Sequence, residues 1–99
     1  MAEELVINKD SKILINPLVI VRGKKSECLV ALLDNSLDFY LLKGTEYLVW
    51  QQLMDRGRTL GALFEFLITN IQMNRDDVSL FLTKYIRRLN SLNLINIAK

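Results

Sequence analysis

The stretch Ser36–Leu53, SLDFYLLKGTEYLVWQQL, predicts a short strand that leads directly into an amphipathic helix. Its first part has bulky residues on both faces of an alternating pattern, as in a short pleated strand. After Gly44 the apolar residues recur at helical spacing. The alternating strand residues are Leu37, Asp38, Phe39, Tyr40, Leu41 and Leu42, and the helical stripe is Val49, Trp50, Leu53 and Met54.

Two further strands precede this stretch. Pro17 stands at the head of Leu18–Val21, where a strand tolerates a missing amide, and Glu27–Leu33 is apolar on both faces. Turn-forming residues separate these segments from each other and from Ser36–Leu42. Three short strands with connections of about four residues or fewer predict an antiparallel meander.

Three helices follow the meander, and their ends carry recognisable signals. We expect Thr45 to cap the first helix through its hydroxyl group and Gly57 to end it in the left-handed conformation. Thr59 and Asn74 are the expected caps of the second and third helices. Asn93 tolerates the left-handed conformation and should end the third helix.

These elements predict an α+β, winged helix-turn-helix-like fold in which a three-stranded antiparallel sheet is followed by three helices. A chain of 99 residues has room for one domain with a modest core. We expect residues 1–12 to form a flexible N-terminal segment and residues 13–99 to form the single domain. Trp50 is expected to anchor the core, and Cys28 to be an inert buried residue.

The composition excludes several classes of catalytic protein. The chain has no histidine, which removes Ser-His-Asp and Cys-His arrangements and most zinc sites. Its four glycines are scattered singly, so no phosphate-binding loop is present. We therefore expect no enzyme, cofactor or metal site. A single cysteine favours the reducing cytoplasm, and the longest uncharged run is too short to span a membrane.

The first candidate site is the free edge of the predicted third strand. Charges or proline usually protect an edge strand, because bare amide and carbonyl groups recruit other strands. Ser36–Leu42 has only Asp38 as such a guard. An extended peptide could therefore add to this edge. The N-terminal segment or a second copy of the protein could instead cover it, and the sequence leaves these alternatives open.

The second candidate is one flank of the third helix, expected from about Arg75 to Leu92. Val78, Leu82, Tyr85 and Leu89 form the stripe that must face the core. Beside this stripe lies an apolar floor with a basic rim, which suits an amphipathic peptide with acidic groups. Aromatic residues on such a stripe are more often simply core, and the basic residues beside them can be a solvated face. The candidate side chains are Phe81, Lys84, Tyr85 and Arg88.

The order of these elements resembles the PqqD-like family, the RiPP recognition elements. The likeness extends from about Pro17 to Ile95. Lys43 and Asn93 depart from the family pattern, which has asparagine and glycine at these places. The matching residues are Tyr40-Leu41-Leu42, Val49-Trp50, Leu53, Arg58-Thr59-Leu60 and Asn93-Leu94-Ile95.

The resemblance implies a non-catalytic adaptor that binds the leader of a ribosomally synthesised precursor peptide by strand addition and delivers it to a modifying enzyme. In the family the leader lies between the third strand and the third helix. The implied partners are the precursor peptide and a maturation enzyme such as a radical-SAM enzyme, a leader protease or a cyclase. We expect no membrane partner, and a monomer or weak homodimer.

A winged helix-turn-helix DNA-binding protein is the alternative interpretation. The last two helices have the helix-turn-helix order, and the third carries several basic residues. However, Asp76 and Asp77 lie at the end that would enter the major groove, where phosphates repel them. With 13 basic and 11 acidic residues, the chain has a net charge of only +2, which gives weak electrostatic attraction to a phosphate backbone. Nucleic acid is therefore the less favoured partner.

Overall fold

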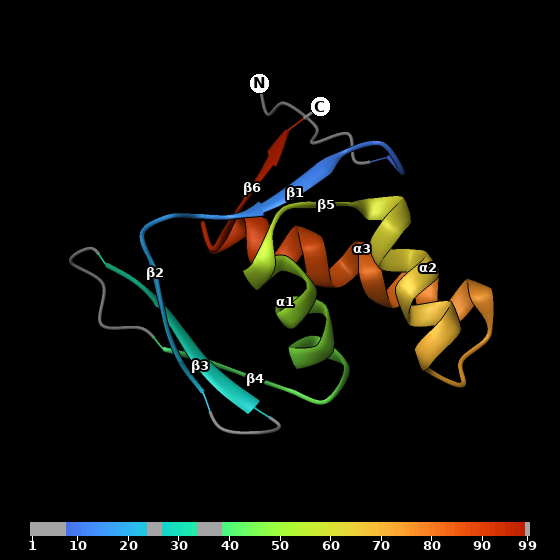
Figure 1. Ribbon diagram of the computed structural model, residues 1–99, viewed down its shortest axis with the longest axis horizontal. Coiled ribbons are helices and arrows are strands. Elements are labelled where there is room, and N and C mark those ends of the chain that lie inside the picture. Colours follow the sequence, from blue (N-terminus) through green and yellow to red (C-terminus); the bar gives the residue numbers. More distant parts are fainter. Residues whose placement is uncertain (1–7, 24–26, 34–38, 99) are drawn as a thin grey trace.

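The computed structural model describes residues 8–23, 27–33 and 39–98, which form two small sheets and three helices (Figure 1). The helices lie between the two sheets in the view of Figure 1. The elements in chain order are β1 (Lys12–Ile15), β2 (Val19–Gly23), β3 (Glu27–Leu32), β4 (Tyr40–Lys43), α1 (Thr45–Asp55), β5 (Arg58–Thr59), α2 (Leu60–Asn70), α3 (Arg75–Ser91) and β6 (Ile95–Ala98).

The predicted meander is present as the antiparallel sheet β2-β3-β4. Of the residues predicted for the third strand, Tyr40, Leu41 and Leu42 lie in β4, whereas Phe39 precedes it. Leu37 and Asp38 lie outside the described residues. Pro17 is not at a strand head either, because it belongs to a turn before β2. Asn16 closes this turn by accepting a 2.9 Å hydrogen bond from the Val19 amide at its carbonyl oxygen.

The second sheet, in the order β5-β1-β6, was not predicted from the sequence. β1 pairs along its length with β6, and its first two residues also pair with the two-residue strand β5. Lys12, at the expected boundary of the N-terminal segment, therefore lies opposite both Thr59 and Ala98. These strands are too short for a clear alternating pattern, and their partners lie far away in the sequence.

The helix ends agree with the expected signals at three of five positions. The Thr59 hydroxyl accepts from the Ala62 amide at 3.1 Å, the Asn74 side chain accepts from the Asp77 amide at 2.8 Å, and Asn93 has φ 62°. Thr45 is not the cap of α1, because it is already helical and Gly44 occupies the cap position with φ 64°.

Gly57 does not end α1 in the left-handed conformation, because the helix stops at Asp55 and leaves through an extended Arg56. The prediction of a positive φ at Gly57 is therefore wrong: among the described glycines only Gly44 has a positive φ. Gly57 instead allows a close approach of two segments. A Cβ atom there would collide with the Leu14 side chain and lie 3.1 Å from the Ile13 carbonyl oxygen.

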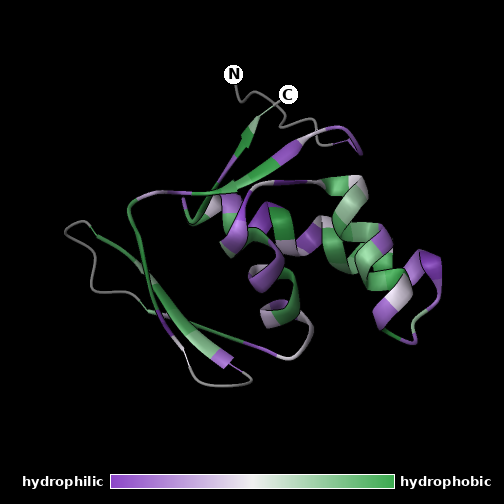
Figure 2. Cartoon of the chain, viewed as in Figure 1, coloured by the Kyte–Doolittle hydropathy of each residue, from purple (hydrophilic) through white to green (hydrophobic). Residues whose placement is uncertain are grey.

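The core lies between the helices and the inner faces of the sheets. Trp50 is fully buried in it and Cys28 is 2% exposed, so both residues have the core positions expected of them. The stripe of α3 (Val78, Leu82, Tyr85, Leu89) is buried as predicted. Figure 2 shows that hydrophobic residues also continue along β3 and the adjoining part of β2.

Candidate functional site

The strand β4 is at one edge of its sheet. In the order β2-β3-β4 its inner neighbour is β3, and no strand of the described residues pairs with its other side. The register aligns Tyr40 with Val30 and Leu42 with Cys28. The edge singled out in the sequence is therefore an edge in the structure as well, from Tyr40 to Lys43.

The hydrogen-bonding pattern of the sheet indicates which groups of β4 point outward. The Leu33 amide donates to the Leu18 carbonyl oxygen at 2.7 Å, so odd-numbered residues of β3 bond toward β2. Residues of an antiparallel strand bond alternately to its two neighbours. Even-numbered residues of β3 therefore bond to Tyr40 and Leu42, and the amide and carbonyl groups of Leu41 and Lys43 face the open edge.

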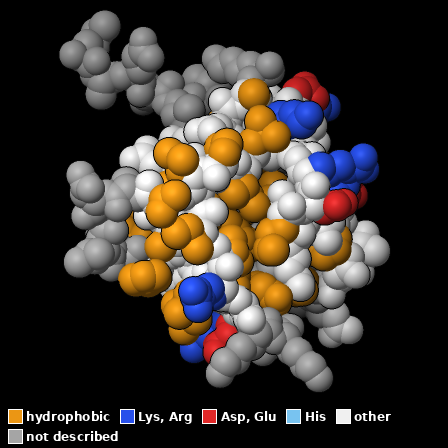
Figure 3. Space-filling view, turned by 60° about the vertical axis from the view of Figure 1, so that its left-hand side comes forward, with side chains coloured by type: hydrophobic (Ala, Val, Ile, Leu, Met, Phe, Trp, Pro, Cys, Tyr) orange, Lys and Arg blue, Asp and Glu red, His pale blue; other side chains and the backbone are white. Residues whose placement is uncertain are grey.

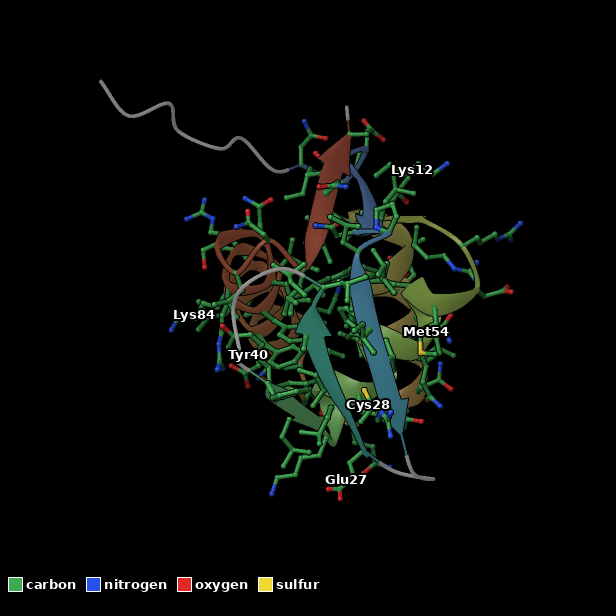
Figure 4. All side chains as sticks on the ribbon, turned by 90° about the vertical axis from the view of Figure 1, so that its left-hand side faces the viewer. Lys12, Glu27, Cys28, Tyr40, Met54 and Lys84 are labelled. Carbon is green, nitrogen blue, oxygen red and sulfur yellow. The ribbon has the colours of Figure 1, made fainter. Side chains whose placement is uncertain are left out.

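A cleft of about 180 Å³ separates this edge from α3. A second hollow of about 170 Å³ adjoins it along α3, and both include Glu46, Tyr85 and Arg88. Figure 4 shows Tyr40 and Lys84 on the same side of the molecule, where α3 lies next to the sheet. The cleft is lined by Phe39, Tyr40, Leu41, Leu42, Glu46, Tyr85, Arg88, Leu89, Leu92 and Leu94, and the second hollow adds Phe81 and Lys84.

Aromatic rings form the floor of this site. Phe81 stacks on Tyr85 with ring centroids 5.6 Å apart, and the Tyr85 hydroxyl donates to the Glu46 carbonyl oxygen at 2.9 Å. Burial raises the pKa of Tyr85, and the nearby Glu46 carboxylate raises it further. Tyr85 is therefore neutral at physiological pH and acts as a hydrogen-bond donor and an apolar wall.

The rim of the site carries both signs of charge. Lys84 and Arg88 are exposed on α3, while Glu46 is half-buried at the start of α1. With two cations and one carboxylate, the rim favours a ligand with acidic groups over a basic one. The arrangement suits an extended or amphipathic peptide.

The structure brings together most of the residues selected from the sequence. Tyr40, Leu41, Leu42 and Phe39 line one cleft with Tyr85 and Arg88, and Phe81 and Lys84 lie in the adjoining hollow. Leu37 and Asp38 are outside the described residues. Leu42 is 4% exposed, so its side chain belongs mainly to the core.

Sequence reasoning missed four lining residues: Glu46, Leu89, Leu92 and Leu94. Leu92 widens the apolar stripe of α3 on the Phe81 side, and this was the signal available for it. Glu46 gave no signal, because its position depends on how tightly β4 turns into α1.

A larger cavity of about 610 Å³ lies on another flank of α3, against α2 and the turn at Asn8 and Lys9. None of its lining residues comes from β4, so it is separate from this site. The described residues contain no cluster of three or more metal-ligating side chains of the His, Cys, Asp or Glu type. Within this part of the chain, no helix is both long and apolar enough to cross a membrane.

Comparison with known proteins gave one informative match. No protein-family model matches the sequence, and no curated protein matches it significantly. The solved structure of TbiB1 in complex with the TbiA(beta) leader peptide matches with a TM-score of 0.77. This chain has the fold of TbiB1. The match covers 84% of this chain and 94% of the TbiB1 chain at 16% identity, and it confirms the α+β fold predicted from the sequence.

Proposed function

We propose that this protein is a non-catalytic adaptor that binds the leader of a ribosomally synthesised precursor peptide. The observation that carries the proposal is the position of an open strand edge beside an apolar cleft with a basic rim. The TbiB1-like fold supports it, because TbiB1 was solved with a leader peptide. In this proposal the leader adds to β4 as a further antiparallel or parallel strand.

Main-chain hydrogen bonds would supply much of the affinity. The outward-facing amide and carbonyl groups of Leu41 and Lys43 are the partners for the leader backbone. Alternate leader side chains would then enter the cleft and contact Tyr85 and Leu92. Acidic leader groups would lie near Arg88, at the exposed rim.

The adaptor would act by raising the local concentration of its cargo. Holding the leader beside a maturation enzyme makes the next encounter nearly intramolecular. The family resemblance suggests a radical-SAM enzyme, a leader protease or a cyclase as that enzyme. The absence of histidine throughout the chain supports a role without chemistry of its own.

The test is to block one outward amide without disturbing the sheet. Leu41→Pro removes an amide that faces the open edge, and proline is tolerated at such edge positions. Leu41→Ala is the matched control, because it shortens the same side chain and keeps the amide. We expect fluorescence polarisation with labelled candidate leader peptides to show about tenfold weaker binding for Leu41→Pro than for the unmodified protein.

The control should bind more tightly than Leu41→Pro, because both variants lose the same leucine side chain and only Leu41→Ala keeps the outward amide. Equal affinity of Leu41→Pro and Leu41→Ala, both folded by circular dichroism, would exclude strand addition at this edge. A parallel titration with random duplex DNA tests the alternative, because steeply salt-dependent DNA binding without leader binding would favour the DNA-binding interpretation.

A further inference from the structure

Glu46 places a carboxylate in the hollows beside β4, together with the cations Lys84 and Arg88. It is half-buried in the first turn of α1 and lines both hollows. Its main-chain carbonyl oxygen accepts from the Tyr85 hydroxyl, but its carboxylate forms no ion pair with any residue that the structure describes. This carboxylate is therefore available to a ligand in the hollows.

Arg88 presents the opposite charge in the same two hollows. It is exposed on α3, and within the described part of the chain it too has no ion-pair partner. Both charges act on Tyr85: burial is the main cause of the raised pKa of Tyr85, the Glu46 carboxylate raises it further, and Arg88 opposes the rise. A carboxylate and a guanidinium thus lie around one tyrosine hydroxyl without pairing with each other.

A leader strand added to β4 would turn every second side chain toward these charges. Leu42 is 4% exposed and faces the inner side of the sheet, whereas Leu41 is 47% exposed and faces the outer side. Leader side chains on the inner side enter the cleft. Two successive ones are about 7 Å apart, because a strand rises about 3.4 Å per residue. Leader residues two positions apart can therefore face Glu46 and Arg88 at the same time.

The other leader side chains would lie on the outer face of the extended sheet. There the exposed Leu29 and Leu41 lie opposite each other on β3 and β4. Figure 3 shows that hydrophobic side chains predominate across this side of the molecule and that charged ones lie in small groups toward its margin. An apolar or uncharged leader residue suits such neighbours, so selection by charge belongs to the residues that face the cleft.

We propose, on the basis of the leader binding proposed above, that Glu46 selects leaders in which a basic residue lies two positions from an acidic one, with both side chains facing the cleft. The basic side chain pairs with Glu46, and the acidic one pairs with Arg88. Without Glu46, the cations of the rim would attract any acidic peptide. With Glu46 present, a leader that is acidic at both positions places one carboxylate against another, which disfavours it.

The preference is set by exposed or half-buried charges and is therefore modest. Replacing the basic leader residue with glutamine removes one ion pair and should weaken binding about threefold. Replacing it with glutamate also adds a like-charge contact and should weaken binding about tenfold in total.

Selection from a phage-displayed library of random decapeptides on the full-length protein tests the proposal without a known leader. Selected peptides that bind more weakly to Leu41→Pro are taken as occupants of the leader site. We expect them to be enriched for lysine or arginine two residues from aspartate or glutamate. Selection on Glu46→Gln should retain the acidic residue and lose the basic one. Glu65→Gln is the matched control, because Glu65 is exposed on α2, lines neither hollow, and its change alters the net charge equally.

One selected peptide is then synthesised with lysine, glutamine or glutamate at the basic position and measured by fluorescence polarisation. The unmodified protein and Glu65→Gln should bind the three peptides in that order over about a tenfold range, and Glu46→Gln should bind them within about twofold of each other. Site-binding peptides without a basic residue, or the same tenfold range in Glu46→Gln, would overturn the role of Glu46 and leave leader binding intact. If Leu41→Pro weakens none of the selected peptides, strand addition fails and the role of Glu46 fails with it.

Discussion

The Tyr85 hydroxyl donates a 2.9 Å hydrogen bond to the carbonyl oxygen of Glu46, which joins the middle of α3 to the first turn of α1. Gly44, with φ 64°, makes the tight connection between β4 and that turn. The bond therefore links α3 to the segment that directly follows the open edge. Both hollows beside the edge include Tyr85 and Glu46, so this link helps to set their width.

Removing this bond should lower stability moderately. Tyr85→Phe keeps the ring that stacks on Phe81 and loses only the hydroxyl donor. The net cost of one such bond is about 1 kcal/mol, which lowers Tm by roughly 4–8 °C in a domain of this size. Thermal unfolding followed by circular dichroism measures it. Tyr40→Phe is the control, since the Tyr40 hydroxyl has no hydrogen-bond partner among the described residues; equal shifts would mean that the Glu46 bond contributes nothing.

Alkaline pH should destabilise the protein through two buried acids. Burial raises the pKa of the Cys28 thiol above its ordinary value of 9.0, and burial together with Glu46 raises the pKa of Tyr85 above 10.0. Above these ordinary values the unfolded chain loses protons that the folded chain retains, so stability falls as pH rises. Urea unfolding between about pH 7 and pH 11 should show this decline. The Cys28→Ala, Tyr85→Phe variant should show a shallower decline, and an equal slope would contradict the assignment.

The parts of the fold that follow local patterns were predictable from the sequence. The three helices have clear 3.6-residue stripes, and the caps Thr59 and Asn74 act within three residues of their partners. The sheet β5-β1-β6 was not predictable, because its strands pair residues as distant as Lys12 and Ala98. Gly57 shows the same limit: its role depends on the approach of Leu14 from another element.

For the candidate site, the residue pattern indicated the third strand of the meander and the third helix. It did not indicate how their side chains and main-chain groups are arranged relative to each other. The apolar edge strand and the basic flank of α3 were visible as patterns. The sequence could not show that Leu41, and not Tyr40, presents its amide to the open edge, because this depends on the register with Val30 and Cys28. It also could not show that Glu46 contributes a carboxylate near Arg88.

Gly57→Ala should destabilise the junction between α1 and β5. The added Cβ would collide with the Leu14 side chain and press on the Ile13 carbonyl oxygen of β1, 3.1 Å away. Overpacking of this kind costs about 1–3 kcal/mol. Urea unfolding monitored by Trp50 fluorescence measures it, since Trp50 is the single tryptophan of the chain and is fully buried. Arg56→Ala, at the adjacent exposed position, should change stability by less than about 0.5 kcal/mol; a loss as small for Gly57→Ala would show that β1 can move away without cost.

The charged rim of the proposed leader site can be tested with two neighbouring arginines of α3. Arg88 lines both hollows beside β4, whereas Arg87 is exposed on the same helix and lines neither of them.

Arg88→Glu and Arg87→Glu change the net charge of the protein equally, so a difference between them reports position and not overall charge. An exposed ion pair contributes up to about 1 kcal/mol, so Arg88→Glu should weaken binding of an acidic leader about fivefold at low salt. The effect should shrink as the salt concentration rises, because salt screens exposed charges. Fluorescence polarisation at two salt concentrations measures both effects. Arg87→Glu should bind nearly as well as the unmodified protein, and equal losses for the two variants would assign the attraction to the net charge of the domain and remove Arg88 from the site.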